Sequence, residues 1–498
     1  MTRIPPALAL RLTGQDSLTV AMAVIEEQSA RIEVLGAENR ALQAEKGVQA
    51  AEIRTQSARI ESLEAENQSL QAKLAGLEAK AGRPTKTPKN SSVPPSRAAK
   101  PNGEVGTKPK PKRRVHPGAC RRLCDNPTRV EDVQAQACPH CAADVSGVAQ
   151  VATETYDHVE IPLAPAIVTR VVLRGGTCPC CQKAFKAPPP PDKPLGSPYG
   201  PNLRAAVVYL RHAHAISYER LAALLETQFG VKLSEGALAS ILAAAAPAFA
   251  VQFKTIRQRL LAGSVICSDE TGFRVGKQNN WIWVFQHGDC CCFVSAPTRG
   301  KVVVAEFLGD VRPLVWVSDR LTSQAGWAEK HQACLAHLLR DAQYALECGD
   351  TVLAARVISL LCRSIRVWRY RERLERQFGP GVLLAFFWRH FMELDELLAT
   401  PIADNTAGEK LRRSLLRDQD KLFVFLVERD VSPTNNSSEQ ALRWSTVFRK
   451  VTNCFRSLWG AKLHADVRSV IETARRRGIG ALEAVRLTLQ GVPLPIAA

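Results

Sequence analysis

Apolar residues recur every seven positions near the start of the chain. Two similar segments, QSARIEVLGAENRALQAEK and QSARIESLEAENQSLQAKL, begin at Gln28 and Gln56, a spacing of four heptads. Most heptads carry Leu or Ile at the two core positions, a and d. Asn39 and Asn67 occupy two of the a positions. Buried Asn pairs favour a parallel two-stranded coiled coil because their amides pair in only one register. We predict a coiled coil over residues 20–80, and through it a homodimer or higher oligomer; a single solvated helix is the alternative.

A polar, proline-rich stretch follows the repeat. Residues 81–117 contain eight Pro, ten Lys or Arg and one Glu, without apolar periodicity. Such a composition buries too little apolar surface to fold, so we predict a disordered basic linker. Two roles fit it equally: contact with DNA without sequence preference, and a solubilising tether.

Paired cysteines mark a small module over residues 118–190. Two C-x-x-C pairs flank the strand-like stretch YDHVEIPLAPAIVTRVVLRGG, and each pair can deliver two thiolates to a tetrahedral zinc ion. The module is therefore expected to resemble a zinc ribbon, with Cys180 as a competing ligand and unrelated buried thiols as the alternative. The predicted zinc ligands are Cys138, Cys141, Cys178 and Cys181.

Helical periodicity appears in residues 200–250. We expect helices over residues 203–215 and 218–228, then a turn and a third helix that is capped by Ser234 and runs through Ala245. This succession is typical of a helix-turn-helix, which predicts a DNA-binding region, although simple helical packing fits equally well. The third helix has few basic or amide side chains, so contacts with phosphates or with a second copy suit it better than base readout.

From Val265 the pattern changes to short apolar runs that predict strands. The expected strands are residues 265–268, 281–285, 290–294 and 314–318, with a helix over 302–308 before the last. Three antiparallel strands, a helix and a fourth strand are the opening order of an RNase H-like fold, in which the first and fourth strands are neighbours. Asp269 and Asp319 directly follow those two strands, so we expect their carboxylates to converge.

Converging carboxylates suit phosphodiester chemistry, which must stabilise charge on the attacking and the leaving oxygen. Two Mg²⁺ (or Mn²⁺) ions about 3.5–4 Å apart do this, and clustered carboxylates hold such hard cations. Glu439, in the run PTNNSSEQALR, is the predicted third carboxylate because a helix begins beside a turn there. Glu439 and Arg443 form an i, i+4 pair, and a surface salt bridge is the alternative interpretation.

Charge points to nucleic acid as the partner. The formal net charge is +18, and Lys and Arg excesses of this size usually neutralise phosphates. No run of 18 apolar residues and no basic amphipathic anchor occurs, so we expect no membrane partner. Fifteen cysteines and a start without an apolar signal-like run lead us to expect a cytoplasmic, nucleoid-associated protein. The residues expected to contact DNA are Arg443, Arg449, Lys450 and Arg456.

Several short motifs occur in a fixed order. They are DETGFRV at 269–275, Ser318 with Asp319, CLAHLLR at 334–340, PTNN at 433–436 before Glu439, and IETA at 471–474. In combination they resemble the bacterial insertion sequence 66 family of DDE transposases, and the resemblance covers nearly the whole chain. Phe273 stands where that family often has Trp, Gln440 where it often has Arg, and Arg320 where it often has Gly. None of these departures removes a carboxylate.

The resemblance implies a multidomain α+β protein. An RNase H-like catalytic core over residues 260–325 and 433–465 would be split by a helical insertion over 326–432, which shows no strand signal, and followed by a helical segment over 466–498. It also implies an enzyme that binds element ends as double-stranded DNA, cleaves a phosphodiester and joins the freed 3′-OH to target DNA. Asp269, Asp319 and Glu439 would hold Mg²⁺, and accessory proteins of the same element are possible partners. A packed helix face, rather than a zinc pair, is expected for Cys334 and His337.

Three rival interpretations stand beside this one. The first is a DNA-binding regulator derived from a transposase and catalytically inactive, against which the three intact carboxylates argue. The second is a coiled-coil scaffold without nucleic acid, against which the net charge argues. The third is an RNase H-like nuclease or recombinase of another type.

Overall fold

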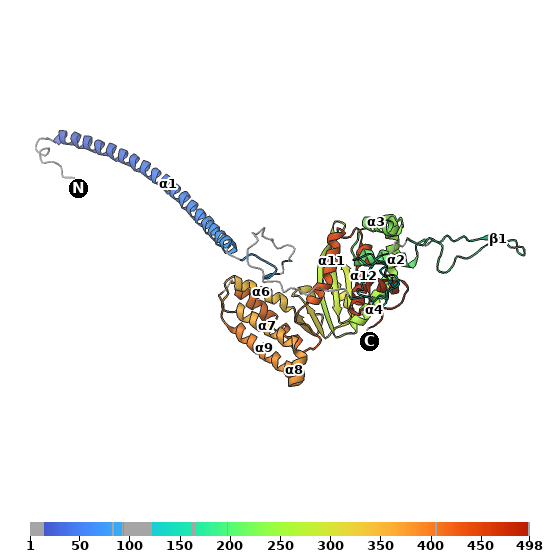
Figure 1. Ribbon diagram of the computed structural model, residues 1–498. Helices are drawn as coiled ribbons and strands as arrows, with labels where there is room; N and C mark the ends of the chain where they lie inside the picture. The colour runs from blue at the N-terminus through green and yellow to red at the C-terminus, as the bar shows by residue number, and fades with distance from the viewer. Residues whose placement is uncertain are drawn as a thin grey trace. The chain divides into compact units, whose positions relative to one another are not determined.

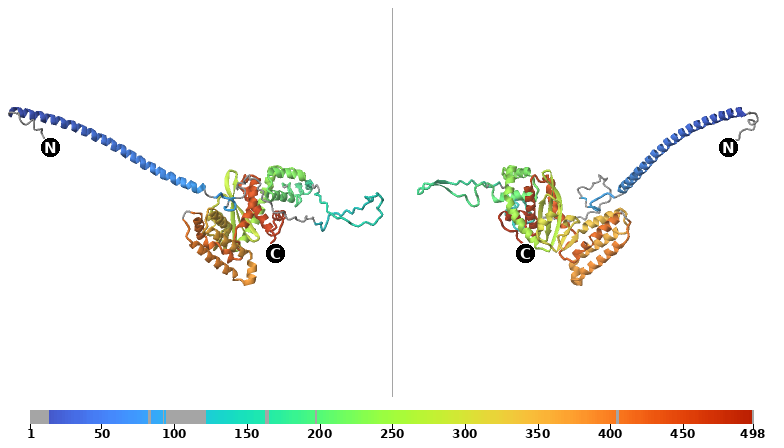
Figure 2. Two further views of the ribbon diagram at one scale, coloured as in Figure 1. Left: turned by 60° about the vertical axis from the view of Figure 1, so that its left-hand side comes forward. Right: turned by 180° about the vertical axis from the view of Figure 1, so that it is seen from behind.

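The structure is a computed structural model that describes residues 14–81, 84–91, 93, 122–161, 165–196, 198–403 and 406–496. The chain divides into two compact units, Met1–Thr85 and Lys86–Ala498, each drawn in Figure 1 and, from two further directions, in Figure 2. The first unit is helical and the second combines helices with a mixed sheet, so the chain is of the α+β class. Most of the predicted basic linker lies outside the described residues.

The first unit contains one long helix, α1 (Gly14–Ala81), rich in the strong helix formers Ala, Glu, Leu and Gln. The apolar side chains at its heptad core positions are exposed on this single chain. They include Ile32, Leu35, Leu42, Ile53, Ile60, Leu63, Leu70 and Leu74. Pairing of this stripe with a second copy remains a prediction.

The cysteine-containing segment has little regular structure. Two short strands, β1 (Gly175–Thr177) and β2 (Ala184–Lys186), form an antiparallel hairpin around the second cysteine pair. The expectation of a strand between the two pairs is wrong for residues 156–161 and 165–174, which are described and are not in strands. Their apolar side chains, Ile167 and Val168 among them, are exposed, so no packing against a core favours an extended ladder there.

Three helices follow: α2 (Pro201–Ala213), α3 (Tyr218–Phe229) and α4 (Glu235–Leu261). The predicted cap of α4 is confirmed, because the Ser234 side chain accepts a hydrogen bond from the Ala237 backbone N–H at 3.1 Å. The predicted end of that helix at Ala245 is wrong, since α4 continues through Pro247. Burial of Phe249 and Ile256 beyond the proline stabilises the longer helix.

By length and composition α4 also passes the test for a membrane-spanning helix, with a mean hydropathy of 1.7 over its most apolar window. Its buried side chains, however, belong to the protein core, where α4 packs against α2 and α12 (Leu458–Arg476). A core helix of a soluble domain has the same composition, so the hydropathy of α4 is weak evidence for a membrane span.

A five-stranded sheet forms the centre of the second unit, in the order β5-β4-β3-β6-β7. The strands are β3 (Val265–Val275), β4 (Gln278–His287), β5 (Cys290–Ala296), β6 (Val315–Ser318) and β7 (Lys330–Ala333). The first three pair antiparallel, whereas β6 pairs parallel with β3 and with β7. The predicted neighbourhood of the first and fourth strands is confirmed by the pairing of β3 with β6.

Two sequence-based expectations about this sheet are wrong. Asp269 was expected just past the end of the first strand, but β3 continues through it to Val275 because residues 267–275 pair with β4. A mainly helical insertion without strand signals was expected after Gly326, yet β7 forms there and extends the sheet beside β6. The backbone of β7 is held by this pairing although its sequence, KHQA, has no apolar alternation.

Alternating side chains of the strands form two core layers. Ile266, Trp283 and Trp316 pack with α4 and α5 (Lys301–Leu308) on one face, and Phe273 and Val284 pack with α11 (Asn436–Val451) on the other. Helix α12 runs along the edge strand β5. There the hydroxyls of Ser469 and Thr473 accept hydrogen bonds from the Phe293 and Cys291 backbone N–H groups, at 2.7 and 3.1 Å. These bonds satisfy and cover a strand edge that would otherwise pair with other chains.

Helices fill the chain between β7 and α11 and pack on one another and on β3 and β6 (Figure 1). They are α6 (Leu335–Glu347), α7 (Ala354–Arg369), α8 (Arg371–Phe378), α9 (Val382–Ala399) and α10 (Ala407–Arg417), with 3₁₀ turns at Gln419–Lys421 and Val424–Leu426. Arg320, just past β6, pairs with Asp341 of α6 and bonds Ser414 of α10. Its guanidinium therefore joins these helices to the end of the sheet. A 3₁₀ turn, Thr322–Gln324, and the last helix, α13 (Ala481–Leu489), complete the described elements.

Candidate active site

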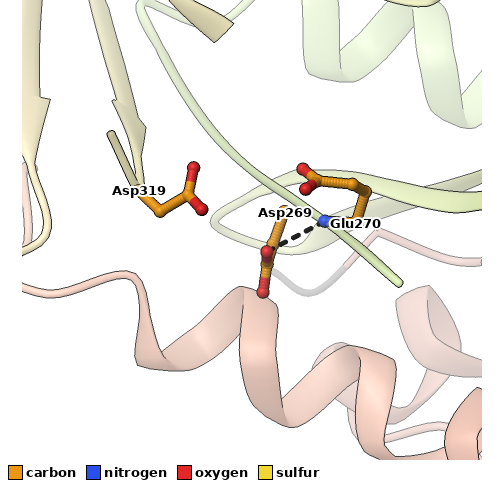
Figure 3. A group of neighbouring side chains, drawn as sticks. All are labelled: Asp269, Glu270 and Asp319. Carbon is orange, nitrogen blue, oxygen red and sulfur yellow. Dashed lines mark hydrogen bonds between the residues drawn. The ribbon is translucent and has the colours of Figure 1, made fainter. Parts of the chain in front are cut away.

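Three carboxyl groups gather where β3 and β6 lie side by side. One oxygen each of Asp269, Glu270 and Asp319 can be chosen so that all lie within 4.8 Å of one another (Figure 3). Parallel pairing of β3 with β6 brings Asp319, which follows Ser318, next to the middle of β3. The convergence of Asp269 and Asp319 expected from the sequence is thus present in the structure.

Local hydrogen bonds hold the two aspartates. The Asp269 carboxylate accepts from the Glu270 backbone N–H at 2.9 Å, and the Asp319 carboxylate accepts from the Leu321 backbone N–H at 3.0 Å. Each carboxylate keeps its other oxygen available to a ligand. Carboxylate oxygens in such a cluster are the donors that Mg²⁺ and Mn²⁺ prefer, so the residues present fit a divalent ion of this kind.

Glu270 is a member of the cluster that sequence reasoning missed. Neighbouring side chains of a strand point to opposite faces, which gave no reason to group Glu270 with Asp269. In the structure the Glu270 carboxylate accepts hydrogen bonds from Arg299 Nε at 2.7 Å and from Gln324 Nε2 at 2.6 Å. Because these two side chains occupy its oxygens, Glu270 differs from Asp269 and Asp319 in being already paired.

Burial and electrostatic repulsion both disfavour ionised carboxylates in this cluster. Burial raises the pKa of Asp269 well above its usual range, and the charges of Glu270, Asp319 and Glu439 raise it further. Burial and the Asp319 charge also raise the pKa of Glu270, against the opposing effect of Arg299. The site thus concentrates negative charge that a bound cation would offset.

Glu439 lies in the first turn of α11 and faces the same site. It lines a cavity of about 400 Å³ together with Asp269, Glu270 and Arg443. Its carboxylate is 3.9 Å from Nε2 of His337, and the described residues show no ion pair between Glu439 and Arg443. Glu439 is outside the 4.8 Å cluster, so the structure brings it to the cavity without bringing it into contact with both aspartates.

The PTNN motif fixes the start of α11. The Asn435 side-chain amide donates to the Ser268 carbonyl of β3 at 2.7 Å, and its backbone N–H donates to Sγ of Cys334 at 3.1 Å. The Pro433 carbonyl accepts from the Leu335 backbone N–H at 3.0 Å. These bonds tie α11 to both β3 and α6, so the position of Glu439 depends on the same strand that carries Asp269.

The C-x-x-H motif contributes to this arrangement. Cys334 is buried and its sulfur accepts the Asn435 hydrogen bond, while His337, one turn later, faces Glu439. Burial lowers the pKa of His337, with Glu439 opposing the shift. Among the described residues Cys334 and His337 belong to no three-residue metal group.

The four cations expected to contact DNA differ in their surroundings. Arg443 lines the cavity beside Glu439, and Lys450 and Arg456 are exposed. Arg449 instead donates to the Thr271 hydroxyl at 3.2 Å and to the Gly272 carbonyl, which joins the end of α11 to β3. DNA contact by these side chains remains a prediction.

The two cysteine pairs adopt the same turn. In each, the first cysteine's N–H donates to the carbonyl five residues later and its carbonyl accepts from the N–H four residues later, all at 2.9 Å. The residue after each pair, Ala142 or Gln182, has a positive φ of 58° or 54°. Hydrogen bonds from the backbone N–H groups of the same turn lower the pKa of Cys138 and of Cys178. The described residues do not bring the two pairs together into one metal group.

Replacing Asp269 with Asn tests the cost of burying this carboxyl group beside other carboxylates. Its folded-state pKa is raised, so this carboxyl group destabilises the metal-free protein at neutral pH; the cost declines as pH falls through the raised pKa and is gone below the unfolded-state pKa of about 3.9. We expect Asp269→Asn to raise the melting temperature by a few degrees at pH 7.5 and by less near pH 4.5. Mn²⁺ should stabilise the parent and not the variant in the same scanning calorimetry experiment. Asp310→Asn, at an exposed position, is the control; a lower melting temperature for Asp269→Asn would contradict this account.

Comparison with known proteins agrees with this geometry. Residues 196–463, which are more than half of the 498-residue chain and include all three predicted catalytic carboxylates, match the family described as Transposase IS66 family. No curated protein matches the sequence. By the extent of the family match, the chain belongs to the IS66 transposase family.

Proposed function

We propose that this chain is an active DDE-type DNA transposase with an RNase H-like catalytic core, and that Asp269, Asp319 and Glu439 form its catalytic centre. The observation that carries the proposal is the meeting of Asp269 and Asp319 on neighbouring parallel strands, with Glu439 lining the same cavity. The strand order supports the fold assignment, because three antiparallel strands precede a helix and a fourth strand that returns beside the first.

The proposed reaction has two phosphoryl-transfer steps. In the first, water attacks a phosphodiester at an element end, a new P–O bond forms, and the bond to the 3′ oxygen breaks to leave a 3′-OH. In the second, that 3′-OH attacks a phosphodiester of the target DNA. A new P–O bond joins the element to the target, and the target's own 3′ oxygen leaves. Mg²⁺ or Mn²⁺ ions bound to the three carboxylates would supply charge stabilisation at the attacking and leaving oxygens.

The chain's own residues position these groups. Arg299 and Gln324 occupy the oxygens of Glu270, whereas Asp269 and Asp319 each use one oxygen in a backbone hydrogen bond and offer the other to an ion. Asn435 holds Glu439 at the cavity through its bond to β3. Arg443 and Lys450 are proposed to bind DNA phosphates. The net charge of +18 favours binding of both the element ends and the target DNA. An inactive DNA-binding regulator is disfavoured because no carboxylate of the set is missing.

We also propose one structural zinc ion per chain, bound by Cys138, Cys141, Cys178 and Cys181. The support is the shared turn geometry, in which backbone N–H groups point at the first sulfur of each pair. Matching the two turns supports Cys181, rather than Cys180, as the counterpart of Cys141.

Metal analysis of the full chain, purified under reducing conditions from zinc-supplemented medium, should find about one zinc per molecule. Cys141→Ser and Cys181→Ser should lose most of it, whereas Cys180→Ser, the matched control, should retain it. Loss of zinc in Cys180→Ser but not in Cys178→Ser would assign the ligand differently, and no zinc in the parent would refute the site.

A second copy of the chain is the proposed partner of α1. Its exposed Ile and Leu stripe, with Asn39 and Asn67 in the same heptad positions, supports a parallel coiled coil. DNA binding by α3 and α4, a cytoplasmic, nucleoid-associated location and accessory proteins of the same element complete the proposal.

Glu439→Gln distinguishes a metal-binding role of Glu439 from the alternative of a surface salt bridge. Loss of a charged metal ligand should reduce strand transfer by roughly 100-fold or more, measured with a reporter element bounded by the DNA that flanks the gene. Glu428→Gln is the control, because Glu428 pairs with Lys330 and lies before the turn; it should stay within a few-fold of the parent. Normal transposition by Glu439→Gln, with loss in Glu428→Gln or Asp430→Asn, would show that the third carboxylate is misassigned.

A further inference from the structure

A second, larger cavity adjoins the one that holds the carboxylates. It measures about 850 Å³ and is lined by residues of α2, β4, α11 and α12. Arg443 lines both cavities, so they meet at this side chain on neighbouring faces of α11. Four arginines and two carboxylates line the larger cavity, which is therefore net positive. The arginines are Arg443, Arg468, Arg475 and Arg476, and the carboxylates are Asp430 and Glu472.

Arg468 is the unusual group in this lining. Its residue is only 6% exposed, and its Nε has no hydrogen-bond partner. The nearest carboxylate oxygen, on Glu472, lies 3.9 Å from its Nη2, beyond hydrogen-bond distance. Burial lowers the pKa of Arg468 to about 10, which leaves the guanidinium charged at neutral pH. A buried cation with an unmet donor is costly, and an anion in the cavity would satisfy it.

The other charged side chains of the lining do not neutralise all of its arginines, so positive charge is left for an anion. Glu472 is already shared by Arg475, at 2.6 Å, and Arg476, at 3.4 Å. Arg476 also donates to the Gln286 side chain and so is held by the protein itself. Arg443 makes no ion pair within the described part of the chain. Arg443 and Arg468 are therefore the two lining cations available to a ligand.

Flat side chains line the same cavity. Trp444 is fixed by a hydrogen bond from its indole N–H to the His212 carbonyl at 3.1 Å. Tyr209 and His214 meet edge to face, with ring centroids 4.7 Å apart, at the end of α2. Aromatic rings beside arginines are the combination that binds single-stranded nucleic acid, since the rings stack on bases and the arginines bind phosphates.

We propose that this cavity binds one unpaired nucleotide of the DNA whose phosphodiester lies at the carboxylates. The inference rests on the proposed function, because it assumes DNA at that site. Cavities of about 300–1,000 Å³ hold molecules of nucleotide size, so this one accepts a single nucleotide and excludes a duplex. The phosphate lies by Arg443 and Arg468, and the base stacks among Trp444, Tyr209 and His214. Because Arg443 lines both cavities, the nucleotide bound here is next to the phosphodiester at the carboxylates, and it must be unpaired from the opposite strand to enter the cavity.

Binding of the full chain to fluorescein-labelled DNA without added Mg²⁺ or Mn²⁺ tests this without catalysis. The probes are a 25-base-pair blunt duplex and the same duplex with a three-nucleotide overhang. The parent should bind the overhang duplex about fivefold or more tightly, as base stacking predicts. His214→Ala, at an exposed position of the cavity, and Arg468→Gln, at the cation proposed to bind the phosphate, should each abolish most of this preference and leave blunt-duplex affinity within twofold. Arg468→Lys should restore part of it.

Arg486→Gln, at an exposed position of α13 outside the cavity lining, is the matched control and should behave as the parent. Melting temperatures of all variants within a few degrees of the parent would show that they fold. Equal binding of both duplexes by the parent would overturn the cavity proposal alone, whereas binding of neither would overturn the proposed function as well. Competition by micromolar deoxyadenosine monophosphate, without an overhang preference, would identify a free-nucleotide site and also overturn the proposal.

Discussion

The parallel pairing of β3 with β6 is the constraint on which the rest of the candidate site depends. It puts Asp319 beside Asp269 in partly buried surroundings where water cannot fully screen the two charges. Burial and neighbouring carboxylates raise the pKa of Asp269, so folding assembles charge at a cost. Other contacts of the core, such as α12 along the edge of β5, must offset that cost. Carboxylates that are held together despite their mutual repulsion are typical of functional sites, because they do not stabilise the fold.

The third carboxylate depends on the same strand through a different interaction. Asn435 reaches from the start of α11 to the Ser268 carbonyl, one residue before Asp269. Cys334 accepts the Asn435 backbone hydrogen bond and lies at the start of α6, so the long helical segment between β7 and α11 returns the chain to β3. Residues separated by more than a hundred positions are thereby held together by backbone and amide hydrogen bonds. The larger cavity, which Arg468 of α12 lines, also borders α11, and Arg443 of α11 lines both this cavity and the one with the carboxylates.

Much of the core could be predicted because strands and caps leave local signals. Apolar runs marked β3 to β6, and Ser234 marked the start of α4. Other features left no local signal. The strand β7 is polar and forms only because β6 offers it backbone partners. The helix α4 passes Pro247 because burial on both sides outweighs the cost of the ring. Glu270 joins the carboxylates against strand alternation, and the unmet Nε of Arg468 arises from packing between distant helices.

The central claim is that Glu439, and not Glu270, completes the metal site with the two aspartates. Anomalous diffraction from crystals of the full chain grown with Mn²⁺ locates the ions and their ligands directly. This account predicts manganese bound to Asp269 and Asp319, with a Glu439 oxygen within about 2.0–2.6 Å of an ion and Glu270 still paired with Arg299. Manganese held by Asp269, Glu270 and Asp319, with Glu439 remaining beside His337, would contradict it.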